Sequence, residues 1–183
     1  MATRINITLD ENDYLQFQLY TASKNRRVKN QRRREWLFTT VTFFALAYLF
    51  KRSENDMLSI YFLVTGCLTA VLHPFYSRWR YKRHYRRAIR NTYQHSFGKP
   101  FSLEINNNEI ITTDSGTTGK INLTEVDEIH EIADQIFIQT KGGASLMISK
   151  SKSENFEALK TAIASAVQQH GIKYHTELNW KWR

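Results

Sequence analysis

The sequence has few of the residues that define disulfide-bonded, metal-centred or collagen-like proteins. It contains one cysteine, Cys67, with two prolines and seven glycines among 183 residues. A single cysteine excludes an internal disulfide and any multi-cysteine zinc or iron–sulfur site. The low proline and glycine content, together with 42% hydrophobic residues, excludes collagen-like and low-complexity chains.

Catalytic motifs are also missing. Without a nucleophile–base pair or a metal-ligand spacing, the sequence predicts a protein that is not an enzyme and that needs no cofactor or metal. The nearest approach to a metal site is Glu128, His130 and Glu131. On a strand, positions 128 and 130 share one face and position 131 lies on the other, which favours a solvated polar edge. His170 and His175 follow the last predicted helix without evident partners.

The net charge of +9 is concentrated in two short blocks beside apolar segments. Residues 24–34 and 78–90 each carry seven Lys or Arg, whereas residues 99–183 carry nine basic and eleven acidic residues. In the second block, aromatic residues alternate with arginines, a pattern also found in proteins that bind single-stranded nucleic acid. Beside apolar segments, contact with anionic lipid is the simpler interpretation, and we predict no nucleic-acid partner. The residues expected to contact headgroups and to set the membrane topology are Arg26, Arg27, Arg32, Arg33, Arg34, Arg78, Arg80, Lys82, Arg83, Arg86 and Arg87.

Two apolar segments predict a transmembrane helical hairpin. Residues 57–76 form a run of twenty, which rises about 30 Å as a helix and matches a hydrocarbon core. Residues 36–50 rise only about 22 Å, enough if flanking basic side chains snorkel and the bilayer thins. A buried hairpin of a soluble protein is the alternative, but neither segment has a polar stripe at helical spacing. The residues expected to pack helix against helix are Thr65, Gly66, Cys67, Thr69 and Ala70.

The charges around the hairpin predict its orientation. The linker, residues 51–56, has two basic and two acidic residues, and each outer block has seven basic residues. The positive-inside rule therefore predicts that both termini are cytoplasmic. His73 and Pro74 are expected at the inner end of the second helix, where the proline would end it.

The soluble parts predict an α+β fold. Short strands are expected at residues 4–9, 101–105, 109–113, 117–123, 126–132, 136–140 and 144–148. Their short connections favour an antiparallel meander that forms a small β-barrel. Ser151 and Glu154 have capping-box spacing before a C-terminal helix that would close the barrel and end at Gly171. Residues 10–50 contain no Gly or Pro, which allows one unbroken helix into the membrane. Trp180 and Trp182 favour membrane-interface or domain packing.

The order of these parts resembles the YcxB-like family of bacterial membrane proteins. Residues 7–20, ITLDENDYLQFQLY, resemble its opening strand and helix, and residues 140–163, TKGGASLMISKSKSENFEALKTAI, resemble its closing hairpin and helix. The resemblance implies a pleckstrin-homology-like cytoplasmic domain beside a two-helix hairpin in the bacterial inner membrane. It brings no catalytic residues with it.

Together these features divide the chain into four parts. Residues 1–34 would form a strand and a basic cytoplasmic helix, residues 35–77 the hairpin, residues 78–98 a basic juxtamembrane segment and residues 99–183 the cytoplasmic PH-like domain. We expect a membrane protein without enzymatic activity that presents this domain to a protein partner, to a second copy of itself or to anionic lipid. The alternative is an immunity or accessory protein that neutralises a membrane-acting toxin, which is an analogy with other small two-helix membrane proteins.

Overall fold

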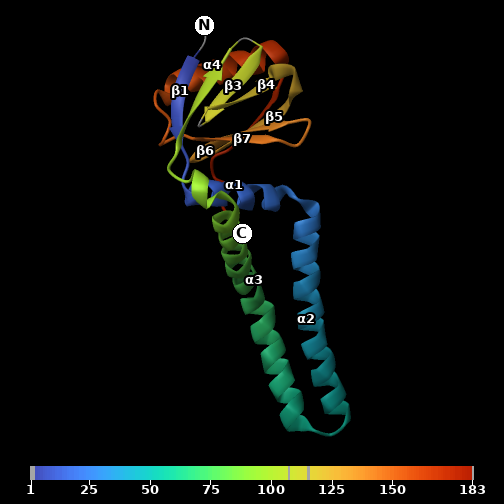
Figure 1. The fold of residues 1–183 in the computed structure, drawn as a ribbon. Coiled ribbons are helices and arrows are strands. Elements are labelled where there is room, and N and C mark those ends of the chain that lie inside the picture. The colour runs from blue at the N-terminus through green and yellow to red at the C-terminus, as the bar shows by residue number, and fades with distance from the viewer. Residues whose placement is uncertain (1–2, 107, 115, 183) are drawn as a thin grey trace. The chain divides into compact units, whose positions relative to one another are not determined.

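The computed structural model describes residues 3–106, 108–114 and 116–182. The elements (Figure 1) are β1 (Thr3–Thr8), α1 (Glu11–Lys24), α2 (Arg26–Arg52), α3 (Asp56–Tyr93), η1 (Gln94–Ser96), β2 (Pro100–Ile105), β3 (Glu109–Asp114), β4 (Thr117–Asn122), η2 (Leu123–Glu125), β5 (Val126–Ile132), β6 (Gln135–Thr140), β7 (Ser145–Ser149), α4 (Phe156–His170) and β8 (Lys173–Glu177). The chain forms two compact units. We call Met1–Phe17 with Ala88–Lys181 the α+β unit, and Gln18–Arg87 with Trp182–Arg183 the helical unit.

The α+β unit contains two four-stranded sheets. One has the order β1-β2-β3-β4 and the other β7-β6-β5-β8. All pairs are antiparallel except β5 with β8, which are parallel. Fully buried side chains from both sheets and from α4 form one core, and they include Ile7, Leu103, Ile136, Ile148 and Leu159. The predicted α+β class is confirmed.

The predicted closed barrel is wrong, because the sheets remain separate. Between β1 and the segment after β7 there is one isolated bridge, from Ile7 to Ser153, rather than a ladder. On the other side, β8 pairs with the edge of β5 that a barrel would offer to β4. A barrel needs continuous pairing around its circumference, and β8 takes the position that would provide it.

The strand β8 was not predicted, and it gives His175 partners. β8 brings the ring of His175 over the ring of His130, with centroids 5.1 Å apart. The Nε2 atoms of His130 and His175 each lie 3.2 Å from one carboxylate oxygen of Glu128. The expectation that His175 lacks a partner is therefore wrong, and His170 belongs to the last turn of α4 rather than following it.

Two helix boundaries also differ from expectation. The helix from residue 10 is interrupted at Asn25, whose side chain accepts a hydrogen bond of 2.8 Å from the backbone N–H of Arg27 and so caps α2. The predicted capping box at Ser151 and Glu154 does not form. The carboxylate of Glu154 instead accepts a hydrogen bond of 2.9 Å from Asn6 on β1, and α4 begins at Phe156. At the other end, Gly171 ends α4 at a φ of 64°, as predicted.

The buried carboxylate of Glu131 accepts side-chain hydrogen bonds that link β8 to β5 and to the residue after β7. Glu131 on β5 accepts a hydrogen bond of 2.6 Å from Lys150 Nζ and one of 2.7 Å from the Tyr174 hydroxyl on β8. Its side chain is 8% exposed and that of Lys150 is 18% exposed. Burial by itself would raise the pKa of Glu131, but the hydrogen bonds from Lys150 and Tyr174 outweigh it and the pKa is lowered.

We predict that Glu131→Gln destabilises the α+β unit by about 2–3 kcal/mol, because it leaves a half-buried Lys150 without its charge partner. A lowered carboxylate pKa contributes stability above the ordinary Glu value of about 4.3, and that stability is lost as the pH falls through the folded-state pKa. The difference between wild type and variant should therefore shrink in acid. Guanidinium unfolding of the detergent-solubilised chain from pH 7 to pH 3, read by pulse proteolysis, measures it. The control is Asp127→Asn, the same charge change at an exposed position of β5. An equal loss in both variants would contradict the prediction.

Candidate membrane interface

In the described part of the chain, α3 is the one helix that is long and apolar enough to cross a membrane. The qualifying span is Asp56–Ser96, with a mean hydropathy of 1.6 over its best 18 residues and 11% of those residues buried. A core helix of a soluble protein would bury most of such a window. By length and composition, α3 can therefore span a bilayer. The apolar part of α2 is too short to qualify by the same measure.

Both helices of the hairpin carry many exposed apolar side chains. Of the 20 large hydrophobic side chains that are exposed among the described residues, 18 lie between Leu37 and Trp79. Phe38 is 77% exposed and Met57 85%. Soluble monomers rarely expose contiguous apolar patches of more than a few hundred Å². We call residues 37–50 of α2 and 57–79 of α3 the apolar belt.

The two helices contact each other along the length of the belt. Near the turn, the rings of Phe50 and Phe62 stack with centroids 5.3 Å apart. At the same level, the buried Ser59 hydroxyl donates a hydrogen bond of 3.0 Å to the carbonyl oxygen of Ala47, and at the far end Trp36 Nε1 donates one of 3.1 Å to the carbonyl oxygen of Ala70. The helices therefore form an antiparallel hairpin, with α2 and α3 side by side (Figure 1).

The predicted packing residues are distributed around α3. Gly66 is at the contact, where a Cβ atom would lie 3.3 Å from Cβ of Phe43, and the Ala70 carbonyl also faces α2. The Thr65 hydroxyl donates to the Tyr61 carbonyl within α3, at 2.8 Å, and Thr69 is half-buried. Cys67 is exposed.

Pro74 does not end the second helix, contrary to prediction, because α3 continues to Tyr93. A proline has no N–H to donate to the carbonyl oxygen four residues earlier, here that of Ala70. The indole Nε1 of Trp36 on α2 donates a hydrogen bond of 3.1 Å to this oxygen. Trp36 thus satisfies an acceptor that Pro74 leaves without its helical donor, which compensates for the hydrogen bond lost at the proline.

This arrangement predicts a dependence between Trp36 and Pro74. Trp36→Phe should destabilise the hairpin by about 1 kcal/mol in the wild-type background, a typical value for an interhelical hydrogen bond in a membrane. In a Pro74→Ala background the cost should fall, because the introduced alanine supplies the missing N–H. The measurement is a double-mutant cycle on hairpin unfolding in bicelles, in which the loss of indole packing is common to both backgrounds. Equal costs in the two backgrounds would show that the two residues act independently.

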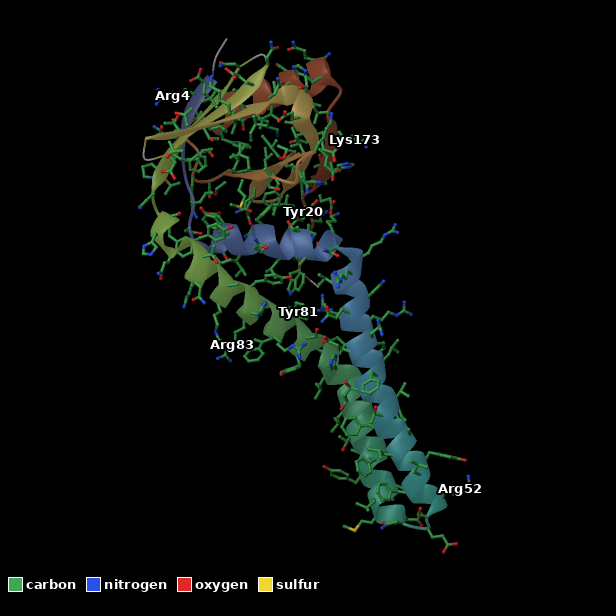
Figure 2. The ribbon with its side chains drawn as sticks, turned by 45° about the vertical axis from the view of Figure 1, so that its right-hand side comes forward. Arg4, Tyr20, Arg52, Tyr81, Arg83 and Lys173 are labelled. Atoms are coloured by element: carbon green, nitrogen blue, oxygen red, sulfur yellow. The ribbon has the colours of Figure 1, made fainter. Side chains whose placement is uncertain are left out.

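The fold brings both basic blocks to the same end of the hairpin. Because α2 and α3 are antiparallel, the start of α2 lies beside the stretch of α3 that follows the apolar belt. Figure 2 shows Tyr81 and Arg83 on α3, at the end of the helical unit away from Arg52 and the turn. All eleven predicted headgroup residues lie in the two basic blocks, residues 24–34 and 78–90. Nine are exposed, and Arg32 and Arg78 are half-buried.

Specific contacts join the two basic stretches. Arg80 forms an ion pair of 2.8 Å with Glu35, and Arg32 Nε donates a hydrogen bond of 3.3 Å to the Ser77 hydroxyl. The guanidinium of Arg32 also lies 5.5 Å from the ring centroid of Tyr81 and 4.9 Å from that of Trp182. Burial lowers the pKa of Arg32, which nevertheless stays protonated at neutral pH. Trp182 thus packs on the basic end of the helical unit.

A groove opens between the two basic stretches, and the sequence analysis did not find it. It has a volume of about 450 Å³ and is lined by Val28, Gln31, Arg80, Tyr81, His84 and Tyr85. Its residues come from α2 and α3 at positions about 50 apart in the sequence, so finding it requires the helix–helix register. The side chains combine apolar walls with hydrogen-bond donors.

Within residues 3–106, 108–114 and 116–182, no group of three His, Cys, Asp or Glu side chains is arranged to hold a metal ion.

Comparisons with known proteins give no relative of the chain. No protein-family model matches the sequence, and none of the curated proteins is detectably similar to it. The resemblance to the YcxB-like family therefore stays a prediction.

Proposed function

We propose that the chain is an inner-membrane protein of bacteria, without enzymatic activity, whose α2–α3 hairpin spans the bilayer and presents the α+β unit to a protein partner or to anionic lipid in the cytoplasm. The observation that carries the proposal is the apolar belt, which ends in a concentrated basic cluster on one side. Such a belt is stable in lipid and costly in water.

The orientation follows from the same cluster. The end of the hairpin with both basic stretches lies on the cytoplasmic side, and the turn at residues 53–55 lies outside. On this assignment both termini are cytoplasmic. The shorter apolar part of α2 crosses because Trp36 is at the interface and the flanking Arg33 and Arg34 can snorkel to the headgroups.

Two observations support a binding role rather than catalysis: polar side chains of the α+β unit bond within the fold, and the sequence has no catalytic motif. The half-buried Lys150 and Tyr174 both donate hydrogen bonds to the buried Glu131 within the α+β unit. The sequence contains no catalytic motif, and the resemblance to the YcxB-like family supplies none. We therefore assign the α+β unit a role in binding.

Membrane extraction combined with protease protection tests the proposal. The chain carries a C-terminal epitope tag and is expressed in bacteria. It is expected to stay with the membrane pellet in alkaline carbonate, with the tag digested only after the spheroplasts are opened. Release into the carbonate supernatant would show that the hairpin does not span the bilayer. Digestion of the tag in intact spheroplasts would reverse the orientation.

A further inference from the structure

We propose that the groove of Val28, Gln31, Arg80, Tyr81, His84 and Tyr85 binds the phosphate-containing headgroup of one anionic phospholipid. This inference rests on the proposed insertion of the hairpin and gives its basic end a defined ligand. The groove volume of about 450 Å³ falls within the roughly 300–1,000 Å³ of small-ligand pockets.

The membrane-facing end of the groove reaches the headgroup layer. Arg80 follows Tyr76, the last residue of the long apolar segment, by about 6 Å along the helix axis at 1.5 Å per residue. Gln31 precedes Trp36, the first residue of the short segment, by about 7.5 Å. The interfacial layer on each side of a hydrocarbon core is about 5–7 Å thick. Both walls of the groove therefore reach the level of lipid phosphates.

The donors in the groove suit a phosphodiester. Arg80 uses Nη2 for its ion pair with Glu35, its side chain is 50% exposed, and a guanidinium has five N–H donors. His84 and Gln31 can supply further donors from the two opposing helices. Burial raises the pKa of Tyr85, so its hydroxyl stays protonated and can donate. Charge-assisted bonds of this type are the strong ones in phosphate recognition.

The apolar walls favour a lipid over a soluble phosphate. Val28, Tyr81 and Tyr85 form a nonpolar lining next to the donors, and the rings of Tyr81 and Tyr85 lie 6.4 Å apart. Toward the apolar belt, Tyr76 is 53% exposed and lies four residues before Arg80, on the same side of α3. A ligand with a charged head and an apolar body fits this sequence of surfaces. Basic pockets between membrane helices on the cytoplasmic side bind such lipids elsewhere.

Three variants separate the groove from general charge. Arg80→Gln removes the main donor of the groove. Val28→Trp fills the groove without changing the charge. Lys29→Gln is the matched control, because it removes one positive charge at an exposed residue of α2 that neither lines the groove nor belongs to the eleven predicted headgroup residues.

The experiment is native mass spectrometry of the full chain in nanodiscs of phosphatidylglycerol and phosphatidylcholine, with glycerol 3-phosphate as a soluble competitor. Wild type and K29Q are expected to retain one phosphatidylglycerol, whereas R80Q and V28W should bind it about tenfold more weakly. Equal losses in R80Q and K29Q, or retention by V28W, would overturn the groove as the site. Retention of glycerol 3-phosphate in place of phosphatidylglycerol when the two are present at equal concentration would show that a free phosphate, not a lipid, is the ligand. Failure to enter nanodiscs, read separately by co-sedimentation, would overturn the proposed function itself.

Discussion

A charged, membrane-impermeant maleimide is expected to leave Cys67 unmodified in intact membranes and to modify it fully once the membranes are dissolved in denaturing detergent. Cys67 is ten residues after Met57 and nine before Tyr76, so each end of the apolar segment is about 15 Å away along the helix. The thiol would therefore lie at the midplane of the bilayer. Its side chain is exposed on the protein surface, so lipid alone would protect it.

The experiment discriminates well because the chain has one cysteine. In a Cys67→Ser chain, Ser53→Cys in the exposed turn should react from outside the cell. Thr118→Cys, on the exposed strand β4, should react only after the cells are opened. If the hairpin were part of a soluble protein, the exposed Cys67 would react as fast as Thr118→Cys without detergent. That result would contradict membrane insertion directly.

The positions of most strands were predictable from the sequence, but their arrangement in two separate sheets was not. Alternation and turn residues located β2 to β7 to within one or two residues, because these signals are local. β8 is short and half-exposed, so it carries little alternation, and its parallel pairing with β5 joins residues more than forty positions apart. That pairing decided between a barrel and two sheets. The break at Asn25 did have a local signal, since asparagine is a favoured N-cap, but its effect was underestimated.

For the hairpin and its basic end, the sequence predicts the composition of the two helices but not the contacts between them. The eleven basic residues and both apolar segments follow from the one-dimensional pattern of charge and hydropathy. The bond from Trp36 to Ala70 requires knowledge of which α2 residue faces the turn before Pro74. The same register, set by contacts such as that of Gly66 with Phe43, opposes Gln31 and His84 across the groove. From the sequence alone, Pro74 is expected to end the helix. The donor that replaces its missing N–H is the indole of Trp36, which lies on α2 and not on α3.

Reversing the charge of four exposed residues at the basic end is expected to disturb the orientation of the hairpin. The variant is R33E/R34E/K82E/R83E, which spares Arg32, Arg78 and Arg80 because these pack or pair within the helical unit. Each basic residue near an anionic leaflet contributes about 1 kcal/mol, so the loss approaches 4 kcal/mol before repulsion by the new carboxylates is counted. The tagged chain should change from a single protected topology to a mixed one, or leave the membrane in part, as measured by protease protection.

The matched control makes the same change in net charge in the α+β unit. K99E/K120E/K141E/K173E reverses four exposed lysines of the α+β unit, all more than twenty residues beyond the apolar segment. The positive-inside rule depends on basic residues within about 15–20 residues of a span, so this variant should keep the wild-type topology despite an identical net charge. If both variants keep it, the basic end does not set the orientation. If both lose it equally, net charge rather than position is responsible. An effect confined to the first variant requires that the basic end of α2 and α3 lies against the cytoplasmic leaflet, which is where the groove would meet its lipid.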